Sequence, residues 1–250
     1  MYGIIGKPLG HSSSAKYFTE KFKNEGIQEV FRNFEIDDPK ELRELVLKYP
    51  DLKGVNVTIP YKQSVIPLLD ELSEEAREIG AVNCIKIIRK TGEPYLKGYN
   101  TDSIGFKQSL ESFFPYRAGD KALILGNGGV AKAVRYVLQT LGIESITVSR
   151  KVPEHSTFSI IPYNKVGVFL KDCRLIVNCT PVGMMPNTDE SPLIPYEMLN
   201  SGHYLFDLIA NPEITTFLKK GENQGAHIQN GMATFLAQAK AGWNIWNEKA

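Results

Sequence analysis

Apolar and polar positions alternate along this chain in a way that predicts an α/β protein. Short apolar runs rich in β-branched residues recur between longer segments whose apolar residues repeat with helical spacing. In the first hundred residues the expected strands are 2–6, 30–36, 54–60, 82–89 and 95–98. The expected helices are 14–25, 39–49, 64–79 and one that follows Asp102. This order predicts a mostly parallel sheet that is covered by helices on both faces.

The second half of the chain repeats the alternation. The expected strands are 121–126, 145–148, 174–178 and 204–208, and the expected helix between the first two is 130–141. A last amphipathic segment, 232–246, has no following strand in its own half, so we expect it to return to the first half. The predicted fold class is therefore α/β with two α/β domains. The predicted domains are residues 1–101 together with 236–250, and residues 102–235.

A glycine-rich turn between a predicted strand and a predicted helix has the spacing G-x-G-x-x-A. It consists of Gly126, Asn127, Gly128, Gly129, Val130 and Ala131. Glycines let a pyrophosphate approach the backbone, and the positive end of the following helix favours the anion. Such glycines also occur in ordinary turns, so the spacing alone leaves both interpretations open. A P-loop would need Gly at 131 and Ser or Thr at 133, where this chain has alanine.

The end of the next predicted strand indicates which dinucleotide would bind. A βαβ unit of about thirty residues follows the glycine turn, as a dinucleotide site requires. Where an NAD-specific site places a carboxylate, the chain has Ser149, Arg150 and Lys151. A guanidinium can grip a 2′-phosphate that a carboxylate would repel, so NADP is favoured over NAD. The alternative is that the two cations are ordinary surface charges.

Composition and charge exclude several classes of partner. The 250 residues hold 29 Lys plus Arg against 28 Asp plus Glu, so no overall field would attract nucleic acid or an anionic membrane. No apolar run approaches the roughly twenty residues that span a bilayer, and the N-terminus does not read as a signal peptide, so we expect a cytoplasmic protein. The cysteines form no C-x-x-C pair and the histidines are scattered, so we expect no metal site.

Polar residues gather near the ends of the predicted strands of the first half. The segment 56–62 ends in Lys62, and a lysine partly desolvated in a cleft can transfer protons near neutral pH. Asp102 could orient such an ammonium, although Thr101 or Asp102 could equally cap the following helix. Ser12 and Ser14, beside His11, could cap a helix or bind a carboxylate that also feels the helix dipole.

Taken together, these motifs resemble the shikimate dehydrogenase family along essentially the whole chain. They match H-S-x-S at 11–14, N-V-T-x-P-x-K at 56–62, G-A-V-N at 80–83, G-x-N-T-D at 98–102, the cofactor turn at 126–131 and a loop at 178–184. The resemblance implies an N-terminal substrate-binding domain and a Rossmann NADP-binding domain, with the C-terminal helix returning to the first domain. It implies catalytic roles for Lys62 and Asp102. It implies substrate contacts for Ser12, Ser14, Thr58, Asn83, Thr101 and Gln238, and cofactor contacts for residues 126–131, Ser149, Arg150, Lys151, Thr180 and Gly231.

The chain also departs from the family pattern. Ala210 stands where the family usually has a tyrosine near the substrate, which puts substrate affinity in doubt. Cys84, Ala15 and the pair Phe18-Thr19 replace other common residues and are interpreted as packing variations.

The resemblance implies the NADPH-dependent reduction of 3-dehydroshikimate to shikimate, with Lys62 and Asp102 handling the proton. The expected partners are this small-molecule substrate and NADP, with no nucleic acid and no membrane, in a monomer or homodimer. Two alternatives remain open: an enzyme that also accepts quinate, and a catalytically silent dinucleotide-binding regulatory protein, since a fold does not fix a function.

Overall fold

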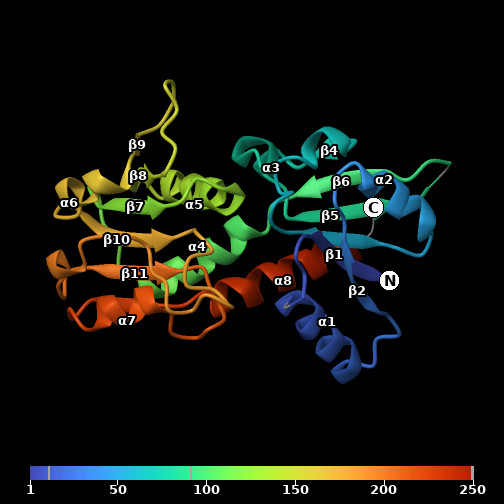
Figure 1. The fold of residues 1–250 in the computed structure, drawn as a ribbon. Helices are drawn as coiled ribbons and strands as arrows, with labels where there is room; N and C mark the ends of the chain where they lie inside the picture. Colours follow the sequence, from blue (N-terminus) through green and yellow to red (C-terminus); the bar gives the residue numbers. More distant parts are fainter. Residues whose placement is uncertain (11, 91, 249–250) are drawn as a thin grey trace. The chain divides into compact units, whose positions relative to one another are not determined.

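The computed structural model describes residues 1–10, 12–90 and 92–248. The chain divides into two compact units, one formed by residues 1–101 with the chain from Ala239 onward and the other by Asp102–Gln238. Each unit is built on a six-stranded sheet. Figure 1 traces both sheets, with the last helix, α8 (Met232–Asn247), in red. The predicted α/β fold class with two sheets is confirmed.

The first sheet has the strand order β2-β1-β3-β5-β6-β4. Its strands are β1 (Tyr2–Gly6), β2 (Phe31–Glu35), β3 (Gly54–Val57), β4 (Glu71–Leu72), β5 (Cys84–Ile88) and β6 (Tyr95–Tyr99). β1 pairs in parallel with β2 and β3, whereas β5 is antiparallel to both β3 and β6. β4 pairs in parallel with β6, so β5 runs against the other five strands. The sheet is mixed, because β5 and β6 form a hairpin and a hairpin reverses the chain direction, but it is mostly parallel, as predicted.

The predicted single helix over 64–79 is wrong. The structure has a short 3-10 turn η1 (Ile66–Leu68), then β4, then the helix α3 (Glu74–Ile79). Pro67 lies in η1 and has no N–H to continue a helix. The backbone N–H of Asp70 donates to the Leu96 carbonyl over 2.9 Å, which pairs this segment with the edge of the sheet. Ser73 then starts α3, because its hydroxyl accepts a hydrogen bond from the Ala76 N–H at 3.2 Å.

Helices cover both faces of the first sheet. They are α1 (Ser13–Asn24), α2 (Glu41–Lys48), α3 and the C-terminal part of α8. Leu42 of α2 packs in one apolar layer with Val55, and Phe18 of α1 packs in the other with Trp246 of α8. The Trp246 indole N–H donates to the Ile85 carbonyl at 3.0 Å. The end of α8 is thus part of the first unit, as the amphipathic pattern predicts.

The second sheet is wholly parallel, with the order β12-β11-β10-β7-β8-β9. Its strands are β7 (Lys121–Leu125), β8 (Glu144–Val148), β9 (Ile160–Ile161), β10 (Cys173–Asn178), β11 (Tyr204–Asp207) and β12 (His227–Gln229). The central strands match the predicted ones closely. The edge strands β9 and β12 escaped prediction because two or three residues are too few to show an alternating pattern.

Helices also cover both faces of the second sheet. They are α4 (Asp102–Phe113), α5 (Gly129–Thr140), α6 (Val166–Phe169) and α7 (Thr216–Glu222), with 3-10 turns η2 (Tyr163–Lys165) and η3 (Tyr196–Met198). One apolar layer joins α4 and α5 through residues such as Phe106 and Val134, and the other joins α6 and α7 through Val166 and Phe217. In such a sheet all strands end at one edge, where ligands bind in α/β proteins.

Candidate functional site

The loops that follow β1 and β3 meet at one edge of the first sheet. β1 and β3 are parallel, so their carboxyl ends lie together, and antiparallel β5 begins at the same edge. The Thr58 N–H donates to the Ile5 carbonyl at 2.9 Å. Gly6 lies so close to the Thr58 methyl group that a side chain at position 6 would collide with it. Thr58 is therefore fixed directly beside the end of β1.

A buried pair of polar side chains lies at this edge. Asn83 and Thr101 are 3% and 1% exposed. The Asn83 amide group donates to the Thr101 hydroxyl at 3.0 Å, and the Asn83 side-chain oxygen accepts from the Thr101 N–H at 2.7 Å. The backbone N–H of Val82 donates to the carbonyl of half-buried Lys62 at 2.7 Å. The structure thus brings the Lys62 loop next to the segment that carries Asn83.

The two serines near the N-terminus have different positions on α1. Ser12 is the helix cap, because its hydroxyl accepts a hydrogen bond from the Ala15 N–H at 3.3 Å. Ser14 lies inside the first turn and is buried, at 8% exposed. The alternative of a cap role for Ser14 is therefore wrong, since Ser12 holds that position. His11, the other polar residue of this motif, lies outside the described residues.

Asp102 and Gln238 lie on two packed helices of the second unit. Asp102 is the first residue of α4 and is 8% exposed. One turn later, Gly105 faces the backbone of α8, and a side chain there would collide with the Thr234 carbonyl and lie 3.1 Å from the Gln238 N–H. Because Gly105 carries no side chain, α4 and α8 pack closely near both residues.

The glycine turn of the second unit has the geometry of an anion site. Gly126 directly follows β7 and has φ +106°, a conformation that favours glycine, and its N–H donates to the Val148 carbonyl at 2.8 Å. Gly128 is the N-cap of the 12-residue helix α5, and within the described chain no side chain caps that end. The first N–H groups of α5 and the positive end of its dipole therefore suit a pyrophosphate.

A buried polar network fixes the loop that follows β10. The Asn178 side chain donates to Asp207 at 3.1 Å and accepts from the Thr180 hydroxyl at 2.7 Å. Asp207 also accepts from the Thr215 hydroxyl at 2.6 Å and from the Ile209 N–H at 3.0 Å. Burial raises the pKa of Asp207 to about 6 against the effect of these hydrogen bonds. The network holds Thr180 beside the glycine turn.

The remaining predicted cofactor residues lie after β8 and before α8. Ser149 follows β8 directly, and its hydroxyl accepts from the Lys151 N–H at 3.3 Å. Arg150 and Lys151 are exposed. Gly231 donates its N–H to the Ile209 carbonyl at 3.0 Å, and the chain there leaves no room for a side chain. These residues lie near the carboxyl edge of the second sheet, with the glycine turn and Thr180.

Arg135 of α5 was missed by the sequence reasoning. It donates from Nη2 to the side-chain oxygen of Asn127 at 3.0 Å and to the Thr147 hydroxyl at 2.9 Å. Burial, and after it the charge of Arg135, lower the pKa of Lys132 one turn earlier. The two cations together favour an anion near the glycine turn. An arginine on an amphipathic helix has the sequence pattern of a solvated charge, so no local signal identified it.

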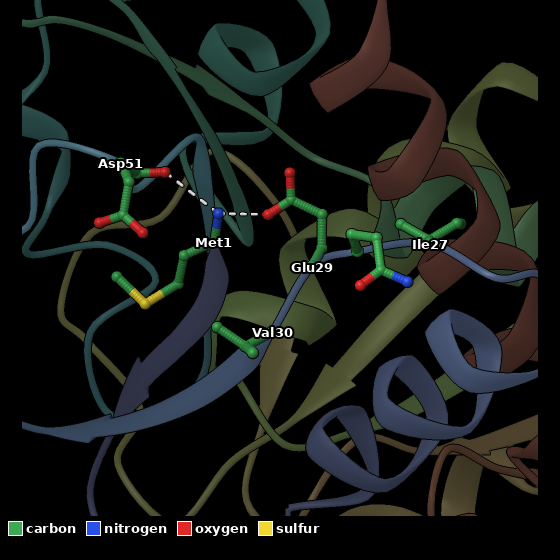
Figure 2. Close-up of a pocket in the computed structure, with 6 residues that line it drawn as sticks. Met1, Ile27, Glu29, Val30 and Asp51 are labelled. Carbon is green, nitrogen blue, oxygen red and sulfur yellow. Dashed lines mark hydrogen bonds and ion pairs between the residues drawn. The ribbon is translucent and has the colours of Figure 1, made fainter.

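A surface pocket of about 310 Å³ lies at the opposite edge of the first sheet (Figure 2). It is lined by Met1, Ile27, Gln28, Glu29, Val30 and Asp51. The N-terminal ammonium contacts the Glu29 carboxylate and donates to the Asp51 carbonyl at 3.1 Å. Burial would raise the pKa of Glu29, but hydrogen bonds from Lys53 and the ammonium outweigh it and lower that pKa. These groups bind one another, so we do not assign the substrate to this pocket.

Residues 1–10, 12–90 and 92–248 contain no group of three or more His, Cys, Asp or Glu side chains that could hold a metal ion. Within the same ranges, none of the helices combines the length and the apolar character that crossing a bilayer requires.

The fold and the residues at the carboxyl edges of the two sheets define a class of protein. It is an α/β enzyme with one unit that binds a dinucleotide and another unit whose sheet has polar side chains at that edge. Residues 4–85 match the family model of the shikimate dehydrogenase substrate binding domain. The NADP(+) shikimate dehydrogenase of Halothermothrix orenii is 37% identical over 98% of this chain and 89% of its own length.

Solved structures agree with these matches. Shikimate dehydrogenase from Aquifex aeolicus has a TM-score of 0.86 at 33% identity, covering 98% of this chain and 91% of its own. The enzyme from Thermus thermophilus, solved in complex with NADP(H) and shikimate, has a TM-score of 0.82 at 28% identity, covering 98% and 92%. The chain belongs to the shikimate dehydrogenase family.

Proposed function

We propose that this protein catalyses the reversible, NADPH-dependent reduction of 3-dehydroshikimate to shikimate. The observation that carries the proposal is the hydrogen bond of 2.7 Å between the Val82 N–H and the Lys62 carbonyl. This bond holds the loop of Lys62, a residue that can act in proton transfer, beside the buried side chains of Asn83 and Thr101. An edge of this kind suits a small polyhydroxylated substrate, and membership of the family supports the same reaction.

We assign the substrate contacts by the chemistry of each group. Ser12 and Ser14 lie at the N-terminal end of α1, where the helix dipole favours a carboxylate. Thr58, Asn83 and Thr101 offer hydroxyl and amide groups for ring hydroxyls, and Gln238 offers an amide from α8. Ala210 replaces a hydroxyl that relatives usually have, so we expect these groups to carry substrate affinity without it.

The cofactor site fits NADP. The uncapped start of α5 suits the pyrophosphate, Thr180 and Gly231 lie at the same sheet edge, and Ser149, Arg150 and Lys151 suit a 2′-phosphate. When bound, NADPH supplies the hydride. Lys62 and Asp102 then handle the proton that the alkoxide oxygen of the product needs. The Lys62 ammonium also stabilises negative charge on that oxygen as it forms.

The test follows NADPH absorbance with the purified protein and 3-dehydroshikimate, and with quinate or shikimate and each oxidised cofactor for the reverse direction. We expect oxidation of NADPH by 3-dehydroshikimate. We expect Lys62→Ala to lower kcat by about two or more orders of magnitude and to change KM much less, because it removes a proton-transfer group. Lys48→Ala, which removes an exposed lysine at the end of α2, is the matched control.

Three results would contradict this proposal. Cofactor binding without turnover on any of these substrates would indicate a regulatory protein. Equal turnover of quinate and shikimate would indicate dual specificity. Near-wild-type kcat in Lys62→Ala at saturating substrate would remove Lys62 from the mechanism.

A further inference from the structure

Arg135 joins three segments of the cofactor-binding unit that are separate in sequence. It lies nearly two turns into α5, six residues after the helix begins at Gly129. Its Nη2 atom donates to Asn127 in the glycine turn and to Thr147 in β8. Its guanidinium also stacks on Phe158, with the central carbon 3.5 Å from the ring centroid. Asn127 and Phe158 are exposed residues of loops that Arg135 holds to the helix.

Phe158 lies near the end of the loop that begins at Ser149 and carries Arg150 and Lys151, the candidate contacts of the 2′-phosphate. The loop leaves the sheet at Ser149, and its return is fixed where the Thr147 N–H donates to the Ser159 carbonyl at 2.9 Å. Arg150 lies in this loop and is exposed, so the direction of its side chain depends on how the loop is held. The stack of Arg135 on Phe158 holds the loop one residue before it rejoins the sheet.

The geometry of Arg135 requires a planar guanidinium and not merely a positive charge. A guanidinium can stack on an aromatic face while its edge donates hydrogen bonds, and a lysine ammonium cannot do both. The Arg135 Nε atom is buried and has no hydrogen-bond partner in the part of the chain that the structure describes. A buried donor without a partner destabilises the folded protein, which is unexpected for a residue whose role is only structural.

We propose that Arg135 is a positioning residue for NADP: it holds the glycine turn and the Arg150 loop in one fixed relation and so sets the preference for NADP over NAD. The proposal rests on the proposed function, because it assumes that Arg150 reads the 2′-phosphate. Two contacts of Arg135 have different consequences. Its hydrogen bond to Asn127 orders a turn that binds the pyrophosphate common to both dinucleotides. Its stack on Phe158 orders the loop whose Arg150 contacts the 2′-phosphate, which only NADP has.

The test measures the dissociation constants of NADP and NAD directly, by calorimetry on the full-length protein, together with thermal stability. We expect Arg135→Ala to weaken NADP by about tenfold or more and NAD by a smaller factor, so the preference for NADP falls. Arg135→Lys should behave like Arg135→Ala, because the stack and the shared donor are lost while the charge stays. Phe158→Ala should weaken NADP and leave NAD unchanged.

Arg174 provides a matched control. It too combines an aromatic contact, 5.2 Å from the Phe114 ring, with a hydrogen bond of 2.8 Å to Asp120, but it lies near the amino end of β10. Arg174→Ala should lower stability and leave the ratio of NADP to NAD affinity unchanged.

Three outcomes would overturn the proposal. Equal losses of NADP and NAD affinity in Arg135→Ala would mean that the residue only supports the fold. Full NADP affinity in Arg135→Lys, with no effect of Phe158→Ala, would mean that a point charge contacts the phosphate. Unchanged affinity in Arg135→Ala would remove it from cofactor binding. Failure of the proposed function is distinct, since wild-type protein would then bind no NADP or turn over no substrate.

Discussion

Asp207→Asn should abolish one component of the pH dependence of stability in the second unit. Asp207 is fully buried, and burial raises its pKa from 3.8 to about 6. The folded protein therefore binds more protons at this carboxyl group than the unfolded chain does between these two values. Stability that is present below about pH 4 is lost as the pH rises through about pH 6.

The magnitude follows from the size of the shift. A pKa change from 3.8 to about 6 corresponds to about 3 kcal/mol in the free energy of unfolding, at roughly 1.4 kcal/mol per unit. Asparagine keeps an oxygen that can accept from the Ile209 N–H and has no charge to bury. The difference in stability between Asp207→Asn and the wild type should thus rise by about 3 kcal/mol across this window, in favour of the variant.

The assay must report on the second unit. Both tryptophans, Trp243 and Trp246, belong to the first unit, so their fluorescence would follow the wrong part of the protein. Amide hydrogen exchange of β10 and β11, corrected for the intrinsic effect of pH, measures the stability of the strands that carry the network. Leu205→Val, which shortens a buried apolar side chain of β11 and removes no titratable group, is the control and should keep the wild-type slope. A slope in Asp207→Asn that equals the wild-type slope would refute the reasoning.

Three other predictions concern the cofactor, the substrate and the core. Arg150→Ala should weaken NADP by about 1–3 kcal/mol and leave NAD nearly unchanged in a binding titration; equal losses would mean that Arg150 does not read the phosphate. Ser14→Ala should raise the KM for shikimate by a factor that corresponds to about 1–2 kcal/mol; loss of thermal stability alone would contradict the carboxylate assignment. Gly54→Ala should lower the melting temperature strongly, because its methyl group would collide with the Trp246 indole, whereas Gly10→Ala meets open space and should not.

The class of fold and the kinds of side chain at each strand end can be predicted from the amino-acid pattern alone. Periodicity identified the central strands and the helices that cover them, because buried strands and amphipathic helices leave patterns over many residues. The glycine turn at 126–131 could be predicted from the sequence, because its backbone geometry depends on residues that are adjacent in the chain. Arg150 follows Ser149 just beyond β8, a strand that the same pattern predicted, so its place near the carboxyl edge of the sheet could also be expected.

How residues far apart in the chain come together depends on the packing of the folded protein. The segment expected to be one helix over 64–79 contains an edge strand, because its backbone pairs with a strand that comes about 25 residues later. The raised pKa of Asp207 comes from burial among elements that no local pattern links to it. Arg135 shows the same limit, since its partners at 127, 147 and 158 meet it only in the folded unit. Local patterns record backbone preference and burial, whereas these contacts depend on which elements pack together.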